Sequence, residues 1–433
     1  MFYIIVVSII TYIGMIVFTK HRTSISFIGS GLLLMLGSVT NIFDADKAFL
    51  KFPGEIVILI IVLSLFTEIF KRLGVIDYIG YKFITLSKGN KVMIVLSIPI
   101  LMYATSLFMN NLTVVLLFTY TTLYLAVEYR LPIVPILVSV VIGSNIGGAP
   151  LPWSDTPAVV LTLYSDFTLI DFLNKLFIPC LVYVLLLSIY TYIWYRYLTP
   201  RKRFLPFREK PDVKWEEVKL PIIVFFIYTI SVSIGPFIDI SIAYISLVFG
   251  GIALLIDKSN PMDILNNLPI MDSLAFIIAL FLIGGVLEYS GVLNSIAESV
   301  IYLTDQNSVL IILSVLVLAF IIATFLSAGP AAATLLPICL NLNHLVPFNL
   351  IYAALALGIL AGSSMLPWSA TGGPILLSQT NKFLKEVKNL EEEDRKSIER
   401  VYDLKSYLLF SIPFSLIILS LSGLYLVIFS KLV

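Results

Sequence analysis

The chain consists of long apolar runs separated by short polar segments. A helix needs about 20 mostly apolar residues to cross a bilayer, and windows of that size predict helical membrane spans. The first run has no basic segment and no small-residue cleavage site, so we expect a span there rather than a signal peptide. The expected spans are 3–18, 26–42, 54–70, 168–194, 220–234, 240–256, 271–287 and 406–429.

One uncharged stretch is too long for a single span. The 36 residues 92–127 carry no formal charge, and a straight helix of that length would measure about 54 Å against roughly 30 Å of hydrocarbon. The most polar spot, 109–113, lies at its middle. The pattern predicts a re-entrant hairpin of two short helices that meet at this polar tip.

The next stretch, 131–165, contains one formal charge, Asp155. Its centre, 144–157, holds two glycines and three prolines, and proline removes a backbone donor and clashes with the preceding turn. We therefore expect a discontinuous helix. Broken backbone at membrane depth is tolerated where it is buried in protein or lines a wet cavity.

The second half of the chain repeats these features. Residues 306–381 carry no formal charge, and 366–369 repeat the Leu-Pro-Trp-Ser of 151–154 at an offset of 215. The Gly-Val pair at 74–75 recurs at 291–292, an offset of 217. The chain is thus read as a duplication of roughly 217 residues, with a second hairpin at 307–342 and a second broken helix at 346–380.

Basic residues orient the two repeats. With the N-terminus outside, only Lys47, Lys51, Lys175 and Lys431 of the 28 Lys and Arg lie outside, as the positive-inside rule favours. The first repeat (1–205) then starts outside, and a cytoplasmic linker (206–219) leads to a second repeat (220–433) that starts inside. The prediction is an all-α polytopic membrane protein with an inverted-topology repeat, a plan common among secondary transporters.

Composition excludes several other classes of protein. Of the 433 residues, 59% are hydrophobic and 13% charged, with a mean hydropathy of +1.00, where soluble domains carry about 25% charged residues. The net charge of +1 offers no basic field for nucleic acid. Two cysteines and two histidines exclude a disulfide framework, a haem bundle and a zinc protease. We expect no enzyme and no cofactor, and we expect membrane lipid and a small ionic solute as partners.

Asp155 is the leading candidate for a functional residue. A carboxylate near mid-depth is costly unless it pairs, protonates or binds a cation, and hard cations prefer oxygen ligands. Asp155 is therefore expected to bind Na⁺ or to carry a coupling proton, with Asn110 and Asn111 as further Na⁺ ligands. The alternative is a helix cap. Its counterpart in the second repeat is Ala370.

Other polar residues at the tips and breaks are candidates for binding the ion or the solute. Half-helix N-termini carry partial positive charge and attract anions, whereas Ser and Thr also hold helices together in membranes, so both interpretations stay open. The remaining candidates are Thr113, Asn145, Gly148, Ser154, Thr156, Ser327, Ser363, Ser364, Ser369 and Thr371.

These motifs resemble the ion transporter superfamily, which includes arsenite permeases, citrate–metal permeases, D-type sodium/proton antiporters and divalent anion/sodium symporters. The run from Asn145 to Gly148 with Ser154–Pro157 is similar to the N-I-G-G … G-D-P-P-N break of the citrate and arsenite branches. The tip at 109–113 resembles the S-N-T tip of the dicarboxylate symporters. The layout resemblance covers nearly the whole chain, implies a homodimer, and leaves the branch open.

The expected function is ion-coupled (Na⁺ or H⁺) secondary transport of a small anion or oxyanion-type solute by alternating access. A sodium/proton antiporter is the alternative, since the lone Asp155 with polar neighbours suits it. A membrane enzyme or channel is disfavoured because no nucleophile–base or metal-ligand set occurs in the sequence. We expect the protein in the plasma or inner membrane.

Overall fold

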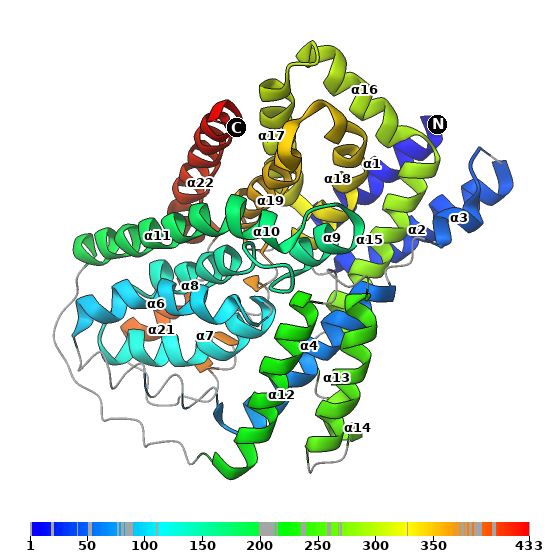
Figure 1. Ribbon diagram of the computed structural model, residues 1–433. Coiled ribbons are helices and arrows are strands. Elements are labelled where there is room, and N and C mark those ends of the chain that lie inside the picture. The colour runs from blue at the N-terminus through cyan, green and yellow to red at the C-terminus, as the bar shows by residue number, and fades with distance from the viewer. Residues whose placement is uncertain are drawn as a thin grey trace.

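The protein is all-α in the part of the chain that the structure describes (Figure 1). No strand occurs among those residues, so the predicted fold class is confirmed. The computed structural model describes residues 2–18, 21–40, 42–50, 54–75, 78, 82, 90–109, 111–198, 213, 215–234, 240–257, 261–266, 268, 271–326, 328–367, 369–370, 372–373, 376, 379–380, 383–384, 392–400 and 404–432.

In the first half of the chain, each span that the apolar runs predict overlaps a helix of the structure. A π-helical turn, η2 (Leu173–Phe177), joins two of them into one continuous helical run. The others are α1 (Phe2–Val17), α2 (Arg22–Thr40), α3 (Ala45–Phe49), α4 (Gly54–Arg72), α6 (Lys91–Ser106), α7 (Asn111–Glu128), α8 (Ile133–Gly147), α9 (Thr156–Tyr164), α10 (Leu169–Phe172) and α11 (Ile178–Tyr197).

The second half follows the same order. Two short 3-10 turns, η4 (Asn343–Leu345) and η5 (Pro347–Asn349), precede its broken helix. Its helices are α12 (Trp215–Ile234), α13 (Ile242–Ile256), α14 (Pro261–Asn266), α15 (Met271–Tyr289), α16 (Val292–Thr304), α17 (Ser308–Leu326), α18 (Ala328–Leu342), α19 (Leu350–Ser363), α21 (Glu392–Glu399) and α22 (Leu404–Leu432).

The duplication is visible in matching elements. Helices α4 and α15 begin at 54 and 271, and α8 and α19 begin at 133 and 350, both 217 residues apart. Asn90 accepts hydrogen bonds from the first backbone N–H groups of α6, and Asn307 does the same for α17. Gly74 and Gly291 share a positive φ (70° and 78°), which glycine adopts without strain.

The two repeats exchange equivalent contacts. Helix α2 packs against α15, and its counterpart α13 packs against α4. Such reciprocal pairing is what a two-fold relation between two copies produces. Before α12 the chain passes through α1, α2, α4, the broken helix and α11, an odd number of crossings. The second repeat is therefore inverted relative to the first.

Each repeat contains a hairpin and a discontinuous helix, as predicted. Helix α6 ends at Ser106 and α7 begins at Asn111, and α17 ends at Leu326 and α18 begins at Ala328. The first discontinuous helix runs from α8 through 148–155 into α9. After α19 the chain turns through 364–367, and the described residues Gly373, Leu376 and Thr380 are again helical.

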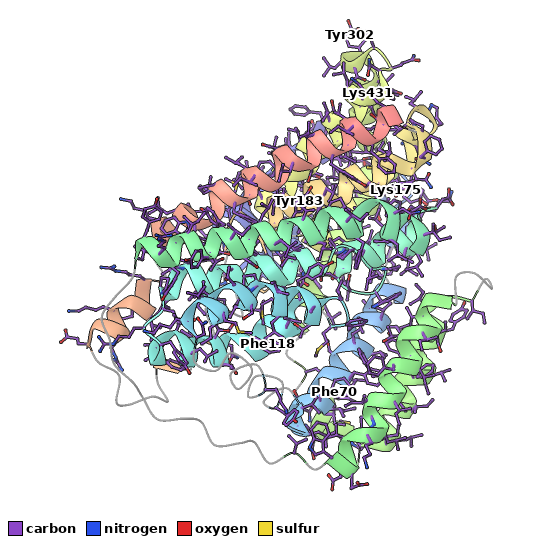
Figure 2. All side chains as sticks on the ribbon, turned by 60° about the vertical axis from the view of Figure 1, so that its left-hand side comes forward. Phe70, Phe118, Lys175, Tyr183, Tyr302 and Lys431 are labelled. Carbon is purple, nitrogen blue, oxygen red and sulfur yellow. The ribbon has the colours of Figure 1, made fainter. Side chains whose placement is uncertain are left out.

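Each discontinuous helix packs closely on the first arm of its own hairpin. A Cβ at Gly147 would lie 2.4 Å from the Tyr103 carbonyl oxygen, and one at Gly362 would lie 2.2 Å from the Phe320 carbonyl oxygen. Small residues let membrane helices approach to backbone contact. Helix α11 covers α6, and α22 lies beside α11, with the Tyr183 hydroxyl 2.7 Å from Ser422 Oγ (Figure 2).

Several described helices suit a bilayer. Four are long and apolar enough to cross it alone: 23–40, 169–197, 308–325 and 405–431. Shorter apolar helices include α1, α13 and the first arms of the two discontinuous helices, α8 and α19. Large apolar side chains remain exposed on the outer faces, among them Ile189, Leu247 and Leu424. The protein is a multi-pass membrane protein. The predicted repeat boundaries stay a prediction, and most of 206–219 lies outside the described residues.

Candidate functional site

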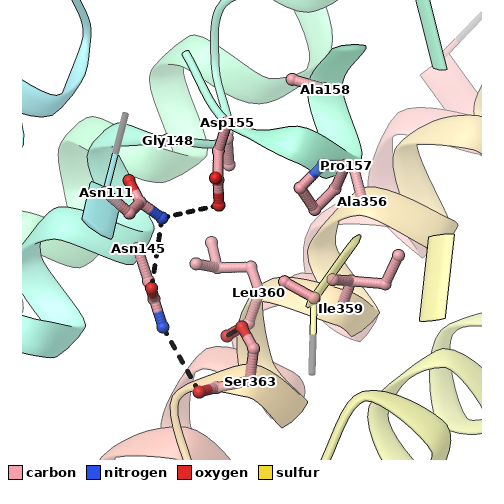
Figure 3. Close-up of a pocket in the computed structure, with 12 residues that line it drawn as sticks. Asn111, Asn145, Gly148, Asp155, Pro157, Ala158, Ala356, Ile359, Leu360 and Ser363 are labelled. Carbon is pink, nitrogen blue, oxygen red and sulfur yellow. Dashed lines mark hydrogen bonds between the residues drawn. The ribbon is translucent and has the colours of Figure 1, made fainter. Parts of the chain in front are cut away.

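A small cavity lies where the helix breaks of both repeats meet the hairpin tips (Figure 3). Its volume is about 20 Å³, enough for one water molecule or a bare ion. Residues from α7, α8, α9, α18 and α19 and from the first break form its walls. They are Asn111, Asn145, Gly148, Ala149, Asp155, Pro157, Ala158, Ala328, Ala356, Ile359, Leu360 and Ser363.

Asp155 occupies the N-cap position of α9. Its backbone is extended (φ −147°, ψ 167°), and its side chain forms no N-cap hydrogen bond. Pro157 follows at the second helical position and has no N–H to offer. The carboxylate, with the residue only 4% exposed, instead accepts a hydrogen bond from Asn111 Nδ2 at 2.7 Å.

Asn111 lies at the centre of a buried network. Its Nδ2 also donates to Asn145 Oδ1 at 3.2 Å, and its Oδ1 accepts from the Ser106 hydroxyl. Asn145 Nδ2 in turn donates to the Ser363 carbonyl at 3.3 Å (Figure 3). Residues 34 and 218 positions apart in the chain thus share one set of hydrogen bonds.

Helix ends set the field in the cavity. Helices α8 and α19 end there, at Gly147 and Ser363, and helix C-termini carry partial negative charge. Helices α7, α9 and α18 begin there, and their N-termini carry partial positive charge. Such a field favours a cation near the carboxylate and an anion near the helix N-termini.

Three predicted serines hold the breaks together. Ser154 Oγ donates to the carbonyls of Gly148 and Leu151 at 2.8 and 2.7 Å. Ser369 Oγ, at the matching place in the second repeat, donates to nearby carbonyls, including that of Ser363 at 3.0 Å. Ser364 Oγ donates to the Leu360 carbonyl at 2.8 Å. These hydroxyls bind the ends of their own broken helices, and fix their shape.

The structure brings five predicted residues to the cavity wall: Asn111, Asn145, Gly148, Asp155 and Ser363. Thr156 is buried beside Gly329 of α18. Asn110, Ser327 and Thr371 lie outside the described residues, as does the side chain of Thr113. Among the described residues, no group of three or more His, Cys, Asp or Glu forms a metal site.

Sequence reasoning missed several residues. Ser106 holds Asn111 in place, and Ala328 and Ala356 line the cavity. Ser411 and Ser415 of α22 donate to the carbonyls of Met365 and Ala361 at 2.6 and 2.8 Å, which satisfies groups that the end of α19 leaves unpaired. The four-residue spacing of Ser411 and Ser415 on one helix face was an available signal.

Comparison with known proteins identifies relatives. Residues 6–362 match a family model described as citrate transporter. A 46 kDa membrane protein of Mycobacterium leprae is 22% identical over 386 residues, covering 86% of this chain and 89% of the relative. The magnetosome protein MamN of Magnetospirillum gryphiswaldense is 23% identical and covers 92% of both chains. The YdaH transporter of Alcanivorax borkumensis has the same fold, with a TM-score of 0.62, 14% identity, and coverage of 94% of this chain and 97% of that one.

Proposed function

Since the chain belongs to the citrate transporter family, we propose that it carries a citrate-type anion across the membrane together with a coupling cation, Na⁺ or H⁺, that binds at Asp155. The family and the YdaH fold make the protein a secondary transporter and not an enzyme. The solute, the coupling ion and alternating access are the parts that we propose.

One observation carries the proposal: a buried carboxylate lies among helix ends of both signs. Among the described lining residues there is no Lys or Arg. A multivalent anion therefore has to be balanced by helix N-termini and by a bound cation. The Asp155 carboxylate supplies the charge for that cation, which supports coupled binding of cation and anion.

The size of the cavity supports alternating access. About 20 Å³ admits an ion or a water molecule but not a molecule of citrate. Solute entry then requires movement of a hairpin, α6–α7 or α17–α18, away from the breaks. Rigid movement of one group of helices against another around a fixed site is the usual way in which inverted-repeat transporters work.

We also propose the placement in the cell. The basic residues favour a plasma or inner membrane protein with its N-terminus outside. Labelling a single cysteine introduced at Ser87 with a membrane-impermeant reagent tests this orientation, since we expect no labelling from outside intact cells. A homodimer remains part of the proposal, and the resemblance to the ion transporter superfamily is its support.

The test uses purified protein in proteoliposomes with a trapped pH dye and radiolabelled citrate. We expect citrate uptake driven by an inward Na⁺ or proton gradient. If the proton is the coupling ion, the dye reports proton movement only when citrate is present. Absence of gradient-driven citrate uptake under both gradients would contradict the proposal.

A sodium/proton antiporter is the second candidate. It is favoured by the single carboxylate among the described lining residues, because one titrating group suits the exchange of a cation for a proton. The same assay separates the two functions. Proton movement driven by Na⁺ alone, with no anion present, identifies an antiporter.

A further inference from the structure

The two halves of the cavity come from different repeats. The polar side chains Asn111, Asn145 and Asp155 belong to the first repeat. The hairpin tip and break of the second repeat, 325–331 and 361–374, contain no Asp, Glu, Asn or Gln. That repeat contributes Ala328, Ala356, Ile359, Leu360 and Ser363. A cation that binds at the first repeat must therefore act on the second through a contact that joins them.

Asn145 makes one such contact through hydrogen bonds, beside the packing of α9 on α18. On one side its Nδ2 donates to the Ser363 carbonyl at 3.3 Å and to Ser364 Oγ at 3.5 Å, both at the end of α19. On the other side its Oδ1 accepts from Asn111 Nδ2, which also binds the Asp155 carboxylate. Figure 3 shows the side chain lying between the two. The amide of Asn145 thus hydrogen-bonds to Asn111 of the first repeat through its oxygen and to Ser363 of the second repeat through its nitrogen.

The direction of each hydrogen bond is determined. The Ser363 carbonyl can only accept, so the amide nitrogen of Asn145 faces it and the amide oxygen faces Asn111. Asn111 must then direct its NH₂ group toward Asn145 and Asp155, and its oxygen accepts from Ser106. This arrangement satisfies every member of the network, and such networks act as units.

A cation at Asp155 disturbs this arrangement at one end. The cation and the Asn111 NH₂ group are both attracted to the Asp155 carboxylate, so an arriving cation weakens the 2.7 Å hydrogen bond. Asn111 then turns, Asn145 loses the donor to its oxygen, and its hold on the end of α19 changes. The chain of contacts leads from the cation to the second repeat.

We propose that Asn145 is a positioning residue that couples cation binding at Asp155 to solute affinity by setting the position of the second break. The inference rests on the proposed function. Coupling between two ligands is measured as the factor by which one changes the affinity for the other, and it is reciprocal. Allosteric coupling factors are commonly about 5 to 150.

The test measures binding of radiolabelled citrate to the full-length protein at low and high Na⁺ and at two pH values. Native protein is expected to show a coupling factor of at least about five for one of the two cations. Asn145→Leu, similar in size but without the amide, is expected to bind citrate with a coupling factor near one. Ser144→Ala, at the neighbouring position, removes a hydroxyl that donates to the Val141 carbonyl of its own helix at 2.9 Å; it is the matched control, expected to stay within about twofold of native.

The outcomes separate the inference from the function. A native factor near one for both cations refutes the proposed coupling, and this inference with it. A native factor of five or more that persists in Asn145→Leu overturns the inference and leaves the function standing. If Asn145→Leu does not fold, Asn145→Ala takes its place under the same criteria. Recovery of coupling in Asn145→Gln, which keeps both the NH₂ donor and the carbonyl acceptor of the amide, supports a positioning role over a purely structural one.

Discussion

Replacing Gly148 with alanine tests the hydrogen bond between Asn111 and Asp155 without touching either residue. Gly148 follows α8 with φ −78° and ψ −6°, a conformation open to alanine. Its added Cβ would lie 2.5 Å from Asn111 Oδ1 and 2.8 Å from Nδ2. Ordinary contact begins at about 3.4 Å, so the amide must move by roughly 0.9 Å, since atoms at shorter distances repel steeply.

That displacement is enough to break the 2.7 Å hydrogen bond to Asp155, because a donor–acceptor distance near 3.6 Å is no longer a hydrogen bond. A hydrogen bond to a charged group contributes about 1.5–3 kcal/mol. Because the cation and the Asn111 amide compete for the Asp155 carboxylate, loss of this hydrogen bond favours the cation, and Gly148→Ala lowers the cation concentration for half-maximal citrate uptake by about ten- to hundredfold.

The assay is citrate uptake into proteoliposomes over a range of Na⁺ concentration and of pH, with Gly251→Ala of α13 as control. A Cβ at Gly251 meets nothing within 4 Å, so this variant is expected to match the native protein. Unchanged cation dependence in Gly148→Ala would contradict this prediction, as would an equal effect in Gly251→Ala.

Three further substitutions test the packing around the site. Gly362→Ala places a Cβ 2.2 Å from the Phe320 carbonyl oxygen, and such overpacking costs about 1–3 kcal/mol or more. The melting temperature in detergent should therefore fall. Gly31→Ala, with open space around its Cβ, should leave the melting temperature unchanged. Ser415→Ala removes the hydroxyl that donates to the Ala361 carbonyl of α19, and the free energy of unfolding is expected to fall by about 1–3 kcal/mol. An unaltered free energy of unfolding would contradict this prediction. Ser106→Ala removes the donor to Asn111 and should change the cation concentration for half-maximal citrate uptake less than Gly148→Ala does, since the hydrogen bond to Asp155 remains. An equal or greater change would contradict this order.

Much of the fold follows from simple features of the sequence. An uncharged run of 36 residues is too long for one crossing, and the structure resolves it into α6 and α7. The Gly- and Pro-rich centre of 144–157 marks the gap between α8 and α9. Because the chain is a duplication, the same features predict the hairpin and the discontinuous helix of the second half. Steric and hydrophobic requirements of this kind depend on residues that are neighbours in the sequence, so the sequence alone predicts them.

The candidate site was only partly predictable. Asp155 and Asn111 are conspicuous because polar groups are rare at membrane depth. The sequence does not predict the structural roles of Ser154 and Ser369. Their hydroxyls donate to carbonyls of the same unwound segment, and which carbonyl each one meets depends on the conformation of that segment. Ser415 reaches a carbonyl 54 residues away. Such a contact depends on how α22 packs against α19, which local sequence does not encode.

The most direct test of Asp155 as the cation site compares native protein with Asp155→Asn in proteoliposomes. The assay measures radiolabelled citrate accumulated under an inward Na⁺ gradient and under an inward proton gradient. The amide keeps the size of the side chain and removes its charge, so accumulation under the coupling gradient should fall at least about tenfold, while the melting temperature stays close to native. Accumulation equal to native under that gradient would contradict the assignment of Asp155 as the cation site.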